Sequence, residues 1–156
     1  MIEQKYKDAV VGINQNLFED GELYYDYVFK LPSELQIIYT INILEQQVYN
    51  GGFYQYFSNG YGQFAFMTIK NLELIRAIAH KELLVKALKG VNSDNFNEKE
   101  FRGLIYNFKL KKIAESGDKL YNLLDDLDTQ YYALEEDLRE LYIDYLENKN
   151  STTENR

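Results

Sequence analysis

The chain has 156 residues, no cysteine and a formal net charge of −8. This length suits one domain with a sizeable core, and the lack of cysteine excludes disulfides and thiolate metal sites. The acidic balance argues against direct binding of nucleic acid, because phosphate contacts rest on clustered lysine and arginine. With no apolar signal segment and no membrane-length apolar run, we expect a soluble, cytoplasmic protein without metal or cofactor.

Apolar residues recur at helical spacing through most of the chain, which predicts an all-α fold. We predict a single-domain helical bundle of six to eight helices over residues 1–148, with a glycine-rich turn between central helices, and a disordered polar tail over 149–156. A first helix is predicted over about residues 3–17. Asp20-Gly21 would end it.

An aromatic-rich segment from Leu23 to Leu31 follows and must end before Pro32, because the residue preceding a proline avoids the helical region. Ser33 and Gln36 then have the spacing of a capping box. This pair predicts the start of a long central helix.

The most distinctive motif follows that helix and consists of Asn50, Gly51, Gly52, Phe53, Gln55, Tyr56, Phe57 and Asn59. Its paired glycines indicate backbone conformations that a side chain would forbid, and we expect Asn50 and Gly51 to end the central helix as a left-handed cap. The motif has no nucleophile beside a base and lacks the context of a phosphate-binding loop. We therefore interpret it as structural.

Two structures fit residues 53–61. Asn59-Gly60 between aromatic residues is typical of a hairpin, and the same pair can cap a short helix. We favour the helix, because a lone hairpin in a helical chain would leave unpaired strand edges.

Further helices are predicted over about 63–77 and 79–89. Asn97 and Glu100 form a second capping box, and Ser116 can cap the start of the C-terminal region.

The C-terminal region has heptad spacing at Leu120, Leu124, Leu127, Tyr131, Leu134, Leu138, Leu141 and Tyr145. This seam would dock onto the bundle or pair with a second subunit, and we expect a homodimer. Asp128 or Thr129 could instead cap a separate final helix.

Residues 115–147 contain eleven acidic and two basic side chains. Within them Asp137, Glu140, Asp144 and Glu147 step by three, four and three residues, which places them along one helix face on the order of 15 Å long. Only Arg139 is near enough in sequence to offset their repulsion. The face is either simply solvated or a binding surface for a basic protein.

Residues 50–59, 74–81 and 127–138 together resemble the bacterial DNA-mimic protein family, over about residues 22–147. The resemblance implies an all-helical, often dimeric cytoplasmic domain and, in one branch, an acidic surface that occupies the DNA-binding face of a transcription factor. Gln47 and Tyr49 depart from the Glu and Asn that many members have before the glycines.

The resulting functional prediction is a non-enzymatic acidic binding protein, a DNA mimic whose partner is a DNA-binding protein. The alternative is an immunity-type or antitoxin-like inhibitor of a basic protein such as a nuclease, and the third is an enzyme of unknown chemistry. The sole histidine, His80, is expected as a surface or boundary residue and supports no catalytic role.

Overall fold

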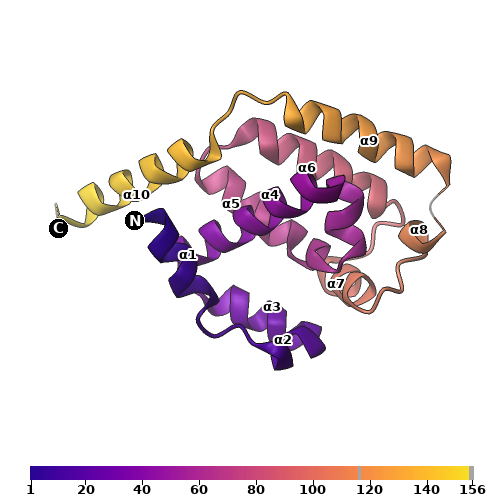
Figure 1. The fold of residues 1–156 in the computed structure, drawn as a ribbon, viewed down its shortest axis with the longest axis horizontal. Coiled ribbons are helices and arrows are strands. Elements are labelled where there is room, and N and C mark those ends of the chain that lie inside the picture. The colour runs from indigo at the N-terminus through magenta and orange to yellow at the C-terminus, as the bar shows by residue number, and fades with distance from the viewer. Residues whose placement is uncertain (116, 155–156) are drawn as a thin grey trace.

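The computed structural model describes residues 1–115 and 117–154, so the predicted cap at Ser116 lies outside the described residues. Within those ranges the chain forms ten α-helices and one 3-10 turn, without a strand (Figure 1). The predicted all-α class is confirmed. The helix number is higher than predicted because α2 and α8, of five and four residues, are too short to show periodicity.

The elements are α1 (Ile2–Val10), α2 (Gln15–Glu19), α3 (Gly21–Lys30), α4 (Ser33–Ser58), η1 (Tyr61–Phe64), α5 (Ala65–Leu74), α6 (Ile78–Val91), α7 (Glu98–Tyr106), α8 (Lys111–Ala114), α9 (Asp118–Tyr132) and α10 (Leu138–Glu154). Helix α4 is central and packs against α1, α5 and α9, while α6 packs against α5 and α9. Figure 1 shows α1–α3 at one side of this group and α10 projecting from it. Across the described ranges, no helix combines the length and apolar character needed to cross a bilayer.

The predicted first helix is interrupted. Helix α1 ends at Val10, and a new helix begins after Asn14, whose side chain accepts a hydrogen bond from the Leu17 N–H. The break at Asp20-Gly21 is confirmed, since the Asp20 carboxylate caps α3. Helix α3 ends before Pro32, as predicted.

The predicted capping box at Ser33 and Gln36 is wrong. Pro32 occupies the N-cap position of α4 without a side-chain cap. The Ser33 hydroxyl instead bonds the Tyr145 hydroxyl at 3.2 Å, and the Gln36 amide donates to the Phe29 carbonyl at 3.0 Å. The two side chains of the predicted box therefore bond Tyr145 of α10 and Phe29 of α3, and neither bonds the backbone at the start of α4.

The capping box of Asn97 and Glu100 is confirmed at the start of α7. The helices predicted over 63–77 and 79–89 correspond to η1, α5 and α6, and α6 continues through Gly90 to Val91. Local capping therefore succeeds here, where no tertiary partner competes.

The predicted C-terminal seam is broken by residues 133–137, which separate α9 from α10. Neither Asp128 nor Thr129 caps the final helix. That role belongs to Asp137, whose carboxylate accepts from the backbone N–H groups of Arg139 and Glu140 at 2.9 and 3.1 Å.

The break changes which heptad positions are buried in the following helix. Before it, the predicted positions are all buried, at Leu120, Leu124, Leu127 and Tyr131. After it, Leu138, Tyr142 and Leu146 are buried, while the predicted Leu141 and Tyr145 are only half-buried. The linker lets each helix present its own apolar face to the bundle. The polar tail predicted from residue 149 also differs, because α10 continues to Glu154.

The homodimer stays a prediction. The apolar seam on which it was based is not available over α9, because α9 packs this face against α4 and α6. Exposed aromatic residues such as Tyr49 and Tyr132 offer other contact area. We expect light scattering at micromolar concentration to return twice the chain mass of 18.5 kDa. A value equal to one chain mass would contradict the dimer.

Candidate partner-binding surface

The paired glycines kink α4 into two helical halves. Gly52 has φ 74° and ψ −177°, a region essentially restricted to glycine, whereas Gly51 has an extended φ of −160°. The predicted left-handed cap at Gly51 is therefore wrong, and the special backbone belongs to its neighbour. The short helix favoured after the glycines is confirmed, since it ends at Ser58 and Gly60 follows with φ 83°.

Helix α9 satisfies the backbone groups that this kink exposes. The Asp128 carboxylate accepts from the Phe53 N–H at 2.7 Å, which caps the second half of α4. The Tyr132 hydroxyl donates to the Val48 carbonyl at 2.8 Å, at the end of the first half. Asp128 and Tyr132 are four residues apart and so share one face of α9. The glycine motif and the 127–138 segment thus form one structural unit.

The amides of the motif form a network around the same kink. Gln47 Oε1 accepts from Gln55 Nε2 at 3.0 Å and from Asn59 Nδ2 at 3.1 Å. Asn50 Nδ2 donates to Gln55 Oε1 at 3.1 Å. Gln47, which stands where the resembled family often has glutamate, therefore still supplies the acceptor oxygen that joins the two halves of α4.

A hollow of about 400 Å³ lies over the turn, lined by Gly51, Gly52, Tyr54, Tyr121, Leu124, Asp125, Asp128, Thr129 and Tyr132. It contains two carboxylates and three tyrosines, and no basic side chain lines it. Burial and the neighbouring Asp125 raise the pKa of the Asp128 carboxyl, against the lowering effect of the Phe53 N–H. A cationic side chain would relieve this repulsion.

The linker between α9 and α10 is fixed by Glu136. Its carboxylate accepts from the backbone N–H groups of Ala79 and His80, both at 3.1 Å, and lies 2.6 Å from His80 Nδ1. Burial acts to raise the pKa of the Glu136 carboxyl, but the His80 and Ala79 hydrogen bonds prevail and lower it. His80 is only 3% exposed and meets the Tyr131 ring edge-on, so its predicted position at the surface or at the boundary of the core is wrong.

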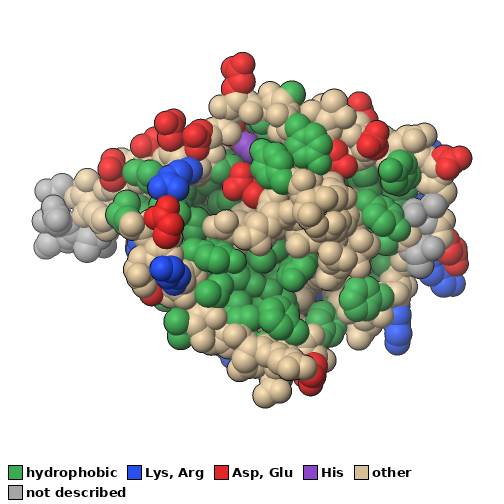
Figure 2. Space-filling model, in the orientation of Figure 1, with side chains coloured by type: hydrophobic (Ala, Val, Ile, Leu, Met, Phe, Trp, Pro, Cys, Tyr) green, Lys and Arg blue, Asp and Glu red, His purple; other side chains and the backbone are tan. Residues whose placement is uncertain are grey.

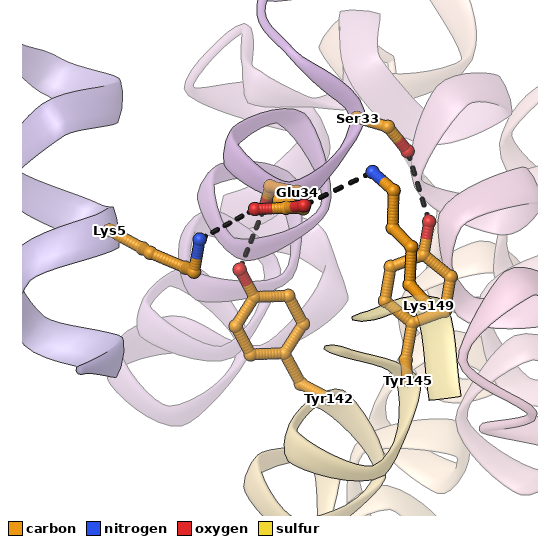
Figure 3. Close-up of polar contacts among 6 residues, drawn as sticks. All are labelled: Lys5, Ser33, Glu34, Tyr142, Tyr145 and Lys149. Atoms are coloured by element: carbon orange, nitrogen blue, oxygen red, sulfur yellow. Dashed lines mark hydrogen bonds and ion pairs between the residues drawn. The ribbon is translucent and has the colours of Figure 1, made fainter. Parts of the chain in front are cut away.

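One carboxylate at the start of α4 contacts both α1 and α10. Glu34 accepts from Lys5 of α1 at 2.5 Å and from Lys149 of α10 at 3.1 Å (Figure 3). Tyr142 donates to the Glu34 backbone carbonyl at 2.9 Å. Hydrogen bonds from Lys5 and Lys149 lower the pKa of the Glu34 carboxyl. Lys149 is exposed, and its ammonium group links α10 to α4.

Three acids of α10 are exposed to solvent. Glu140, Asp144 and Glu147 are exposed and lie on the face opposite Tyr142, and no ion pair within the described chain includes them. Arg139, expected to offset them, instead contacts Glu3 of α1 at 3.1 Å. Figure 2 shows acidic side chains gathered along the edge formed by α9, the linker and α10. We call Glu140, Asp144 and Glu147 the acidic stripe.

Asp137 is also exposed, but we do not count it in the acidic stripe, because its carboxylate caps α10. Sequence spacing alone placed it with the other three, since an N-cap residue lies just one turn before the first exposed acid. Tyr132 and Glu136 were missed as structural groups, and Asp128 was considered as a cap of the final helix when it caps the second half of α4. Their partners lie more than fifty residues away, so no local spacing marks them.

The fold and surface define a small, acidic, all-helical protein in which Arg139 and Lys149 of α10 are in ion pairs with carboxylates of α1 and α4, while Glu140, Asp144 and Glu147 are exposed. Residues 29–149 match the family model of the DMP19-like proteins, and the chain belongs to this DNA-mimic family. The resemblance inferred from the motifs is thereby confirmed. Comparison with curated proteins and with solved structures gives no match.

Proposed function

We propose that this protein is a non-enzymatic DNA mimic whose acidic stripe contacts the DNA-binding face of a basic partner protein. The observation that carries the proposal is the segregation of charge on α10. Lys149 and Arg139 are held by carboxylates of α4 and α1, which leaves Glu140, Asp144 and Glu147 exposed without a basic neighbour in an ion pair. Membership of the DMP19-like family supports the same function.

The physical basis is electrostatic complementarity. A surface that binds phosphates presents lysine and arginine, and a row of carboxylates on a rigid helix can occupy it. Exposed charges act mainly by steering association and are screened by salt. Binding should therefore weaken as ionic strength rises, and double-stranded DNA should compete for the partner.

The stripe is tested by replacing Glu140, Asp144 and Glu147 together with lysine and leaving Asp137 unchanged, because it caps α10. We expect the triple variant to stay folded and to lose about tenfold or more in affinity, since several like-directed exposed charges are reversed at once. The measurement is recovery of partners from native cell extract, followed by titration of the recovered partner at two salt concentrations.

A matched control reverses three exposed acids elsewhere, Asp8, Glu82 and Asp94, and changes net charge equally. The proposal fails if the stripe variant recovers the same partners as the parent, or if the control loses them to the same extent. A recovered nuclease or other basic toxin would instead support the immunity-type inhibitor, which uses the same surface chemistry.

A further inference from the structure

A second pocket lies between α3, η1 and α7, away from the acidic stripe. Its volume is about 460 Å³, within the range of small-molecule sites. Gln63 of η1 lines it and is 2% exposed. The Gln63 backbone N–H donates to the Gly60 carbonyl, but within the described residues no hydrogen bond involves its side-chain amide. Among the described residues the fully enclosed side-chain atom without a hydrogen-bond partner is the Tyr131 hydroxyl, so the Gln63 amide keeps an opening, and it leaves its donors and its acceptor unused by the protein.

Because the Gln63 amide makes no hydrogen bond to the described residues and keeps an opening at the pocket, its donors and its acceptor can bond water or a ligand there. Its donors and acceptor match another amide, which can both accept from and donate to it. The pocket therefore has a polar recognition group at a place where packing alone would favour an apolar side chain.

Opposite charges line this pocket from two different helices. Glu22 and Asp26 come from α3, and Lys99 and Arg102 come from α7. The ion pairs of the described residues include none of these four side chains. Arg102 is instead held 3.6 Å above the Tyr25 ring.

This arrangement matches a molecule that carries a cation, an amide and an anion. We propose that the pocket binds a short peptide with free ends, of dipeptide size. Its ammonium group is taken by Glu22 and Asp26, its carboxylate by Lys99 and Arg102, and its amide by Gln63. Arg102 suits the carboxylate because its planar guanidinium can offer two parallel N–H groups to one carboxylate, and its contact with the Tyr25 ring holds it at the pocket.

The probe is alanyl-alanine, titrated by calorimetry or by protein NMR against the full chain. We expect saturable binding with a Kd of about 1 mM or tighter. N-acetyl-alanyl-alanine lacks the ammonium group, and alanyl-alanine amide lacks the carboxylate, so each should bind at least about tenfold more weakly. No saturation, or equal binding of the blocked analogues, overturns the proposal.

Two variants test the residues. Gln63→Met keeps the side-chain length without the amide, and we expect a Kd raised about tenfold with a melting temperature close to the parent's, since the amide makes no hydrogen bond within the described residues. Lys99→Met, at an exposed position, should weaken alanyl-alanine but leave the amide-ended analogue unchanged. Gln130→Met on α9 is the matched control and should bind like the parent. If Gln63→Met does not fold, Lys99→Met decides alone, and equal losses for both ligands refute the assignment.

Discussion

Replacing Gly52 with valine should destabilise the protein by about 3 kcal/mol or more. The φ of 74° with ψ of −177° disfavours any side chain by about 1–3 kcal/mol. A Cβ would also lie 2.1 Å from Asp128 Oδ2, and the displaced carboxylate would leave the Phe53 N–H without its acceptor, at a further cost of about 1–3 kcal/mol. The free energy of unfolding in urea measures the loss.

Gly51→Val is the matched control. Its φ of −160° is open to any residue, and its Cβ would lie 2.1 Å from Gln55 Oε1 and 3.0 Å from Gln55 Cβ. The flexible Gln55 side chain can shift and lose its exposed hydrogen bond to Asn50, so we expect a smaller loss of about 1 kcal/mol. Adding Asp128→Ala to Gly52→Val should cost less than the sum of the single changes, because both remove the same contact. Equal losses at the two glycines, or strict additivity, would contradict this account of the kink.

Glu136→Ala should destabilise the fold by about 2–3 kcal/mol at neutral pH. The change leaves two backbone N–H groups at the start of α6 and the buried His80 ring without their shared acceptor. Glu135→Ala removes an exposed neighbouring carboxylate and should stay within about 0.5 kcal/mol of the parent. Urea denaturation of the three proteins at one pH makes the comparison.

The stability lost in Glu136→Ala should be larger at neutral pH than in acid. The pKa of Glu136 is lower in the folded protein than its ordinary value of 4.5, so its stabilisation is complete above that value and disappears as pH falls through the folded pKa. The stability gap between the parent and Glu136→Ala should therefore narrow in acid. A gap that stays constant from neutral pH to below the folded pKa would show that the ionised carboxylate is not the stabilising group.

Local sequence determined the helical class, the end of α3 before Pro32, the capping box of Asn97 and the exposed face of Glu140, Asp144 and Glu147. Each of these follows from spacing or backbone restriction within a few residues, and no distant group competes for the atoms involved. The family was also readable from its motifs.

Tertiary structure decided the rest, because the deciding partner in each case lies far along the chain. Ser33 has the local spacing of a cap, yet Tyr145 takes its hydroxyl. Gly52 rather than Gly51 adopts the special backbone, next to the Phe53 N–H that donates to the Asp128 carboxylate of α9, and that carboxylate also occupies the space where a Cβ of residue 52 would be. His80 is buried because Glu136, fifty-six residues later, supplies the acceptor that a buried imidazole and a helix start both need.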